Sequence, residues 1–384
     1  MDYFLSEEQQ MIVEVARQIT DEKIIPQRVE LDEKEEFPSE ILKAVAQADL
    51  FGLYIPEEYG GFGGGCFDMV IALEQFSRGC VGVATSFAAS ALGAYPILIA
   101  GSDELKEKYL PQIASGEKLA AFGLTEANAG SDASGIQTTA VLDGDEWVLN
   151  GTKQWITNGG EAGIYTVIAI TDRSKGPRGA SMFVIEATDP GFSYGAKEKK
   201  LGIRTSSTRE LIFKDCRIPA NRLVGRLGTG FFTVMKTLDL SRPGIASLGL
   251  GLGQAALDES VIYAKQRIQF GKPIISFQAV QHMLADMAIQ LESSRALVYA
   301  TARYIDSKPK DMSKVSSMCK VAATDMAMKV SIDAVQVLAG YGYMRDYPVE
   351  KMMRDAKILQ IYEGTNQIQR NVIGQALNKE YSRS

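Results

Sequence analysis

Hydrophobic residues recur at helical spacing through the first third of the chain. Ser6-Glu-Glu-Gln9 is a capping-box pattern that predicts a helix start, and an apolar stripe follows it, formed by Ile12, Val15, Ala16 and Ile19. We expect Pro26 to end this helix, because proline inside a helix removes a hydrogen bond. A second helix is expected to begin near Ser39. Residues 1–120 are therefore predicted to form an N-terminal helical domain.

An apolar stretch rich in small residues runs from Phe67 to Ala100, after a loop at residues 55–65 that is too rich in glycine to be helical. The stretch predicts two buried helices. Within it, the segment Ser86–Tyr95 carries no charge. Such a segment is typical either of close helix packing or of the wall of an apolar ligand pocket, and its composition leaves both interpretations open.

The spacing of hydrophobic residues changes from helical to strand-like near residue 120. Runs rich in β-branched and aromatic residues predict strands at Tyr165–Ile170, Ala180–Ile185 and Arg209–Asp215. Asn150-Gly151 lies between β-rich flanks, which predicts a hairpin turn at this pair. We therefore interpret residues 121–232 as a middle β-domain, either a small barrel or a sandwich.

Helical spacing returns from about Gly230 to the end of the chain. Long helical segments are predicted at residues 230–265, 277–307, 311–340 and 349–378, with short polar or glycine-containing breaks. Long antiparallel helices with such connections favour a four-helix bundle at residues 233–384. The predicted fold class is α+β, mainly α, in the order helices, β-domain, helices.

The composition narrows the classes of function. The chain has 384 residues, of which 46% are hydrophobic and 23% charged, and its net charge is −6. This composition is typical of a globular protein, and the length allows two or three domains or one large composite. The negative charge argues against nucleic-acid binding. The four cysteines form no CxxC pair, and His282 is the single histidine. A metal site or a Ser-His-Asp triad is therefore not expected.

The two ends of the chain carry no targeting pattern. The acidic N-terminus lacks a basic n-region and an apolar h-region, and the last three residues are not Ser-Lys-Leu. We also expect no apolar run of membrane-spanning length and hence no transmembrane segment. The expected location is the cytoplasm of a bacterium, or the mitochondrial matrix if a presequence was removed.

One segment near the C-terminus combines residues that suit proton transfer. In Ile361-Tyr-Glu-Gly-Thr-Asn-Gln-Ile-Gln-Arg370, the carboxylate of Glu363 stands between an aromatic ring and a glycine. In an apolar cleft the pKa of such a carboxylate rises toward values useful for a base. The alternative is a turn between two helices with a solvated glutamate. The segment alone does not distinguish a base from a turn.

Three further clusters suit a large heteroaromatic cofactor. Leu124-Thr-Glu-Ala-Asn-Ala-Gly-Ser-Asp132 offers hydroxyls and main-chain donors, and Trp155-Ile-Thr-Asn158 offers a flat ring. Arg267-Ile-Gln-Phe-Gly-Lys272 pairs a cation with an aromatic side chain, as a pyrophosphate and an adenine require. The Gly249-Leu-Gly-Leu-Gly253 run has the wrong spacing for a dinucleotide fingerprint and lies in a helical pattern, so we interpret it as close helix packing.

Together these motifs resemble the acyl-CoA dehydrogenases. The resemblance extends to Pro56-Glu-Glu-Tyr-Gly-Gly61, Asp333-Ala-Val-Gln-Val-Leu-Ala-Gly340 and Tyr347-Pro-Val-Glu-Lys-Met-Met-Arg-Asp355, and covers essentially the whole chain in order. It implies an FAD enzyme, usually a homotetramer. Such an enzyme oxidises the Cα–Cβ bond of an acyl-CoA to the 2-enoyl-CoA and passes electrons to electron-transfer flavoprotein. The helix–β–helix layout is also the one that the family would have.

The resemblance assigns a role to individual residues. Glu363 would remove the α-proton while flavin N5 takes the β-hydride, and the main-chain N–H of Glu363 would help to stabilise the enolate oxygen. Residues expected to contact the FAD of the same or a neighbouring subunit are Leu124, Thr125, Gly130, Ser131, Trp155, Thr157, Arg267, Phe270, Gln336, Gly340, Thr365 and Gln367. Residues expected to contact the substrate are Ser131, Phe87, Ala91, Tyr95, Asp239, Arg242, Tyr362 and Gly364, with Asp239 and Arg242 at the nucleotide portion of CoA.

Two departures from relatives narrow the expected substrate. Some relatives carry the base just before the arginine equivalent to Arg242, but Ser241 stands at that place here. Relatives that act on glutaryl-CoA have an arginine in the acyl pocket, whereas Ser86–Tyr95 has no cation. An uncharged acyl group, short, branched or alicyclic, is therefore expected. The alternative function is a non-catalytic or oxygen-using flavoprotein on the same fold.

Overall fold

The N-terminal part of the chain folds into six helices. The computed structural model describes residues 3–382. The helices of this part are α1 (Glu7–Ile19), α2 (Ile25–Lys34), α3 (Ser39–Gln47), α4 (Cys66–Gly79), α5 (Val81–Ala100) and α6 (Asp103–Ala114). The predicted capping box is present, because the Ser6 hydroxyl accepts from the Gln9 N–H and the Gln9 side chain accepts from the Ser6 N–H. The predicted buried helix pair corresponds to α4 and α5.

The prediction that Pro26 ends the first helix is wrong. A π-helical turn, Thr20–Ile24, connects α1 to α2 without a break in the helical path. Pro26 lies in the first turn of α2, where proline is tolerated because a first-turn N–H has no acceptor within its own helix. The wider turn before the proline therefore lets the chain continue to Lys34.

The middle part is built on one eight-stranded sheet with two antiparallel halves. Its strands are β1 (Ala120–Gly123), β2 (Thr139–Asp143), β3 (Glu146–Thr157), β4 (Ile164–Ile170), β5 (Ala180–Glu186), β6 (Phe192–Tyr194), β7 (Thr208–Pro219) and β8 (Leu223–Val224). The half β6-β7-β3-β2 joins the half β4-β5-β8 through a single residue pair, Thr139 with Ile170, and β1 runs parallel beside β4. Trp147 on β3 packs against Phe183 on β5, with ring centroids 5.2 Å apart. The two halves thus face each other across one core, as in a sandwich.

The hairpin turn predicted at Asn150-Gly151 is not present. Both residues lie inside β3, and the turn between β2 and β3 is at Gly144 and Asp145 instead. The register between β3 and β7 shifts here, because Asn150 of β3 lies opposite both Lys214 and Asp215 of β7, so the extra residue of the bulge is on β7. A Cβ on Gly151 would lie 2.5 Å from the Thr138 hydroxyl oxygen, which explains the glycine by close approach to a neighbouring strand.

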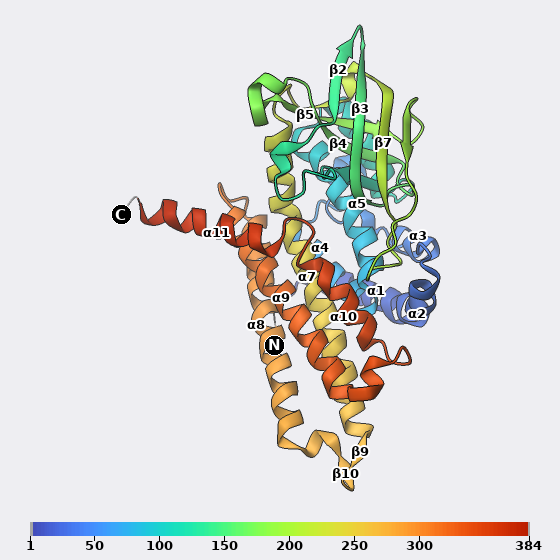
Figure 1. Cartoon of the computed structure of the whole chain (residues 1–384), viewed down its shortest axis with the longest axis vertical. Helices are drawn as coiled ribbons and strands as arrows, with labels where there is room; N and C mark the ends of the chain where they lie inside the picture. Colours follow the sequence, from blue (N-terminus) through green and yellow to red (C-terminus); the bar gives the residue numbers. More distant parts are fainter. Residues whose placement is uncertain (1–2, 383–384) are drawn as a thin grey trace.

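The C-terminal part is the predicted helical bundle. Its helices are α7 (Gly230–Gln266), α8 (Gln278–Asp306), α9 (Ser313–Leu338), α10 (Val349–Leu359) and α11 (Asn366–Tyr381), and the short pair β9 (Ile268–Gln269) and β10 (Lys272–Pro273) links α7 to α8. Figure 1 shows α7 to α10 side by side, whereas α11 projects away from them. The segment predicted at residues 349–378 is therefore two helices, with Glu363 in the turn between them.

The glycines at positions 249–253 pack against neighbouring helices, as predicted. A Cβ on Gly249 would lie 2.7 Å from the Ala323 carbonyl oxygen, and one on Gly251 would lie 2.1 Å from the Glu74 carbonyl oxygen. Only glycine fits at such distances. These residues bring α7 into close contact with α9 on one side and with α4 on the other.

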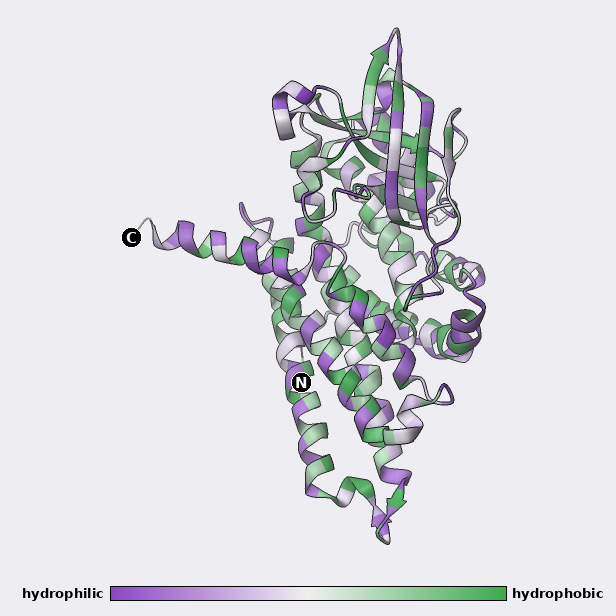
Figure 2. Cartoon of the chain, viewed as in Figure 1, coloured by the Kyte–Doolittle hydropathy of each residue, from purple (hydrophilic) through white to green (hydrophobic). Residues whose placement is uncertain are grey.

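Helix α5 passes from the helical part to the sheet and joins the three parts. It packs against α4, α7 and β1. It is long and apolar enough to span a membrane, so the expectation that no apolar run reaches that length is wrong. Yet 67% of the apolar window is buried inside the protein, as in the core helix of a globular fold. Figure 2 shows the contrast with α11, along which hydrophilic residues predominate.

Candidate active site

A cavity of about 850 Å³ lies where the three parts of the chain meet. Its walls come from α4 and α5, from the loop after β1, from the end of β3, from α7 and from the turn between α10 and α11. Thirteen residues expected to bind cofactor or substrate, or to act as base, line it: Ala91, Tyr95, Leu124, Thr125, Gly130, Ser131, Trp155, Thr157, Arg242, Tyr362, Glu363, Gly364 and Thr365. Residues far apart in the sequence thus surround one space.

The turn that carries Glu363 has an unusual main-chain conformation. The φ angle is 57° at Glu363 and 89° at Gly364, so both residues are left-handed, which disfavours a glutamate. The Gln369 amide donates to the carbonyl oxygens of Glu363 and Gly364 at 3.2 and 3.1 Å. A Cβ on residue 364 would lie 2.4 Å from that amide nitrogen. The left-handed conformation therefore favours glycine at position 364, and a side chain there would displace the Gln369 amide.

The Glu363 carboxylate receives a hydrogen bond inside the cavity. The Ser241 hydroxyl on α7 donates to Glu363 Oε2 at 2.7 Å. Burial raises the pKa of Glu363, whereas the Ser241 hydrogen bond and the positive charges of Arg242 and Lys320 oppose this rise. Burial and the neighbouring donors thus act on the pKa of this carboxylate in opposite directions. Such a carboxylate is suited to act as a general base.

The residues next to Glu363 complete one side of the cavity. The Tyr362 hydroxyl lies 3.4 Å from the Thr85 hydroxyl on α5, and burial raises the pKa of Tyr362. Thr365 is the N-cap of α11, and its hydroxyl accepts from the Ile368 N–H at 3.2 Å. Gln367, predicted to contact the cofactor, is exposed and does not line the cavity. A ligand bound in this cavity therefore does not border the Gln367 side chain.

Residues predicted to contact the flavin, including Gly130 and Trp155, form the opposite side of the cavity. Trp155 has a φ of 57° and lies where the register between β3 and β7 shifts, so a bulge changes the direction of its side chain. Although it lines the cavity, Trp155 is 57% exposed. Gly130 is exposed, and a Cβ built on it would have no neighbour within 4 Å. An exposed ring and an open loop leave room for a large planar group.

A buried ion pair that sequence reasoning missed supports this cluster. The Lys153 ammonium lies 2.7 Å from Glu126 Oε1 and donates to the Leu124 carbonyl oxygen at 3.1 Å. Glu126 also accepts from the main-chain N–H groups of Gln137 and Thr138, at 2.6 and 3.0 Å. Burial lowers the pKa of Lys153 to about 8. The alternation of β3 could have indicated that Lys153 points inward, but nothing in the sequence names its partner.

Besides Gln367, four predicted cofactor residues lie outside the cavity. Arg267, Phe270, Gln336 and Gly340 do not line it. The Arg267 guanidinium lies 5.3 Å from the ring centroid of Tyr341, next to Gly340, and Phe270 is 93% exposed. These residues therefore gather near the β9–β10 end of the bundle, which is the lowest part in Figure 1. These four residues are therefore not part of the cavity wall.

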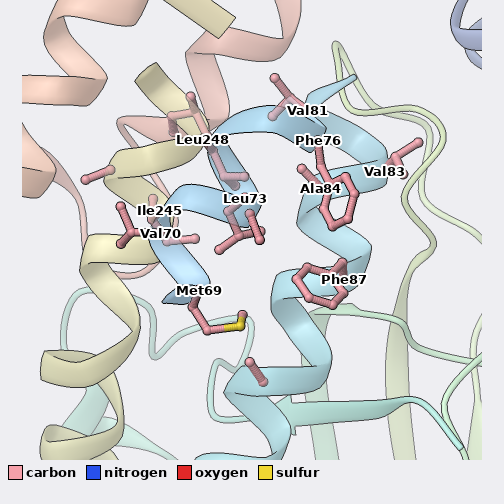
Figure 3. Close-up of a cluster of buried hydrophobic side chains, with 14 of the residues drawn as sticks. Met69, Val70, Leu73, Phe76, Val81, Val83, Ala84, Phe87, Ile245 and Leu248 are labelled. Atoms are coloured by element: carbon pink, nitrogen blue, oxygen red, sulfur yellow. The ribbon is translucent and has the colours of Figure 1, made fainter. Parts of the chain in front are cut away.

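The α5 wall is apolar, and one predicted residue in it faces elsewhere. Ala88, Ala91, Leu92 and Tyr95 share a helical face and line the cavity. Phe87 does not line it, so its assignment to the acyl pocket is wrong. Phe87 is 1% exposed and packs against Phe51 and Phe76, with ring centroids 5.0 and 5.3 Å apart. Figure 3 shows it among the buried side chains of α4 and α5.

Asp239 and Arg242 form a buried pair beside Glu363. The Arg242 guanidinium donates to Asp239 Oδ1 at 2.7 Å, and its Nε lies 3.5 Å from the Glu363 carbonyl oxygen. The Ser313 hydroxyl donates to the other carboxylate oxygen of Asp239. Arg242 lines the cavity but Asp239 does not. The predicted contact of this pair with the CoA nucleotide stays a prediction, because the observed geometry directs Arg242 at the Glu363 turn.

Comparison with known proteins agrees with this geometry. The acyl-CoA dehydrogenase N-terminal, middle and C-terminal domains match residues 6–117, 121–216 and 228–378. The acryloyl-CoA reductase (NADH) of Anaerotignum propionicum is 44% identical over 381 residues, which are 99% of this chain and 96% of that protein. The structure of butyryl-CoA dehydrogenase from Megasphaera elsdenii has 44% identity and a TM-score of 0.96, and the match covers 98% of this chain and 100% of that one.

A second solved structure is equally similar. It belongs to a study of the electron transferring flavoprotein of Acidaminococcus fermentans, directed at the mechanism of flavin-based electron bifurcation. It is 46% identical with a TM-score of 0.96, and the match covers 98% of this chain and 99% of that one. These similarities extend over all three parts of the fold.

Proposed function

Because the chain belongs to the acyl-CoA dehydrogenase family, whose members are FAD-dependent and act on CoA thioesters, we propose that it oxidises a short, uncharged acyl-CoA with Glu363 as the base. One observation carries the proposal. The Glu363 carboxylate shares a cavity with the open loop around Gly130 and with the exposed ring of Trp155. A base and a surface for a planar acceptor thus border the same space.

The residues present fit the cofactor. Trp155 and Thr157 provide a ring and a hydroxyl beside the loop Leu124–Ser131, and the Lys153–Glu126 pair holds that loop against β3. We propose that this cluster holds the isoalloxazine portion of FAD. Bound there, FAD would accept the hydride that leaves the β-carbon of the substrate.

The chain itself performs the proton transfer. Glu363 in its charged form takes the α-proton of the thioester, and the raised pKa makes it a stronger base than an exposed glutamate. The developing enolate oxygen needs donors. Among residues 3–382 we find no acceptor for the main-chain N–H of Glu363, which leaves this group free to donate to the thioester oxygen.

The acyl group is proposed to be short and without charge. The lining residues of α4 and α5 are Cys66, Met69, Leu73, Thr85, Ala88, Ala89, Ala91, Leu92 and Tyr95, none of which is charged. A carboxylate placed there would lose its hydration without a cation, at a cost of several kcal/mol. The similarity to a butyryl-CoA dehydrogenase supports a short chain over a branched or alicyclic one.

We further propose that electrons leave to electron-transfer flavoprotein and that the enzyme is a homo-oligomer. The similarity to a chain studied with such a flavoprotein supports the acceptor. Arg267, Phe270, Gln336 and Gly340 support the oligomer, because none of them lines this cavity and all but the half-buried Arg267 are exposed. In a homo-oligomer, cofactor binding and assembly would depend on each other.

The test is anaerobic flavin bleaching by butyryl-CoA in Glu363→Gln. The variant should retain FAD but bleach roughly a thousandfold more slowly, because an amide cannot take the proton. Glu380→Gln, an exposed glutamate paired with Lys314, is the matched control and should bleach like the wild type. Bleaching of Glu363→Gln at the wild-type rate would refute the assignment. Glutaryl-CoA and cyclohexanoyl-CoA in the same assay test the acyl class.

A further inference from the structure

Lys320 on α9 is fully buried and points at the turn that carries Glu363. Its exposed fraction is 0%, and its ammonium donates to the Gly364 carbonyl oxygen at 2.9 Å and to Asn366 Oδ1 at 2.8 Å. Isolated buried ammonium groups are costly, so they are found where neighbouring groups compensate them. Here the compensating groups belong to the turn itself.

The same turn is held at several points. Gln369 donates to the carbonyl oxygens of Glu363 and Gly364, and Arg242 lies 3.5 Å from the Glu363 carbonyl oxygen. Lys320 is the donor that joins the Gly364 carbonyl to the first residue of α11, Asn366. It therefore connects the left-handed residues to the rigid helix that follows them.

Lys320 also affects the charge of Glu363. The positive charge of Lys320 lowers the pKa of Glu363, and the carboxylate in turn favours the charged form of the lysine. Burial nevertheless lowers the pKa of Lys320 to about 7, and Arg242 adds to this effect. The other titratable groups that interact with this pair are Asp325 on α9, Tyr95 on α5 and Tyr362 in the turn.

We propose that Lys320 is a positioning residue for the dehydrogenation: it fixes the Glu363–Gly364 turn through the Gly364 carbonyl and keeps a positive charge beside the base. This inference rests on the proposed role of Glu363. It makes two separable claims, one about geometry and one about charge. The geometric claim concerns the maximal rate, and the charge claim concerns the pH at which Glu363 becomes active.

Three substitutions separate the claims. Lys320→Met removes the hydrogen bonds and the charge, Lys320→Gln removes the charge but keeps an N–H donor, and Lys320→Arg keeps both a charge and donors. Removal of a nearby cation raises the pKa of a carboxylate by about one unit or more. Lys329→Met is the matched control, because Lys329 is an exposed lysine on the same helix, paired with Asp333.

The measurement is the rate of flavin reduction by butyryl-CoA in the holoenzyme across pH 5.5–9.5, with FAD content and Tm recorded for each variant. In Lys320→Gln and Lys320→Met the acidic midpoint should rise by about one unit, so the rate well below the midpoint falls about tenfold. Lys320→Met should also lose maximal rate. Lys320→Arg and Lys329→Met should keep the wild-type midpoint.

The outcomes distinguish this inference from the proposed function. If Glu363→Gln loses bleaching but the acidic midpoint of folded Lys320→Gln equals that of the wild type, the charge claim is wrong while Glu363 stays the base. If Lys320→Gln and Lys320→Met do not fold, Lys320→Arg becomes the test, because it retains the positive charge. An acidic midpoint of Lys320→Arg above that of the wild type would then overturn the inference. If Glu363→Gln bleaches normally, the proposed function itself fails.

Discussion

The hydrogen bond from Ser241 to Glu363 should control the pH dependence of the reaction. In Ser241→Ala the carboxylate loses a donor that lies 2.7 Å from Oε2. A hydrogen bond to a charged group contributes about 1.5–3 kcal/mol, and about 1.4 kcal/mol corresponds to one pKa unit. Complete loss would therefore raise the pKa of Glu363 by roughly one to two units. Water entering the open cavity replaces part of the bond, so we expect about one unit.

The sign of the effect follows from the role of the base. Glu363 acts when it is charged, and the substitution disfavours its charged form. The acidic limb of the rate profile should therefore move to higher pH by about one unit, with a rate about tenfold lower one unit below the wild-type midpoint. Above both midpoints the two enzymes should converge, because Glu363 is charged in each.

Stopped-flow flavin reduction by butyryl-CoA, measured anaerobically from pH 5.5 to 9.5, tests this expectation. Ser260→Ala is the control: Ser260 is a buried serine of the same helix whose hydroxyl donates to the Ala256 carbonyl at 2.7 Å. It lies roughly 28 Å along α7 from Ser241, by the rise of an α-helix. An unchanged midpoint in Ser241→Ala, or an equal shift in Ser260→Ala, would show that the reasoning is wrong.

Three further substitutions test other parts of the cavity. Trp155→Ala should weaken FAD binding about tenfold, measured by titration of the apoprotein, because a stacking surface worth about 1 kcal/mol or more is lost. Lys153→Met should destabilise the fold by about 3–5 kcal/mol, because the Glu126 carboxylate stays buried without its cation. The loss is measured as a lower Tm. Adding Glu126→Gln to this variant should recover part of the lost stability. Ala91→Leu should reduce kcat/KM more for octanoyl-CoA than for butyryl-CoA at constant FAD content, since Ala91 lines the acyl wall.

The order of the three parts and the position of Glu363 could be predicted from the sequence. The sequence could not show which face of a uniformly apolar helix lines the cavity and which packs into the core. Amphipathic helices reveal their orientation through polar positions. The segment Ser86–Tyr95 has almost none, so Phe87 and Ala88 looked equally suited to the pocket. The structure places Phe87 between Phe51 and Phe76, because its ring fills the core between α4 and α5. Ala88, one residue on, faces the cavity.

Local turn signals failed for a related reason. Asn150-Gly151 favours a tight hairpin, yet β3 continues through it because β7 pairs with the strand on both sides of the pair. Gly144 and Asp145 form the turn that the sheet requires. The long-range pairing thus overrides the local preference, and the glycine allows the close approach of Thr138 instead.

The strained turn at Glu363 depends on residues that no local pattern could identify. The segment Ile361–Arg370 contains the base, its glycine and Gln369, but Arg242 and Lys320 come from α7 and α9. Burial raises the pKa of Glu363, and the positive charges of Arg242 and Lys320 oppose this rise together with the Ser241 hydrogen bond. A left-handed glutamate costs about 1–3 kcal/mol, and it persists only where the surroundings fix it. The segment therefore identifies the reaction, while two cations that are distant in the sequence favour the charged form of its base.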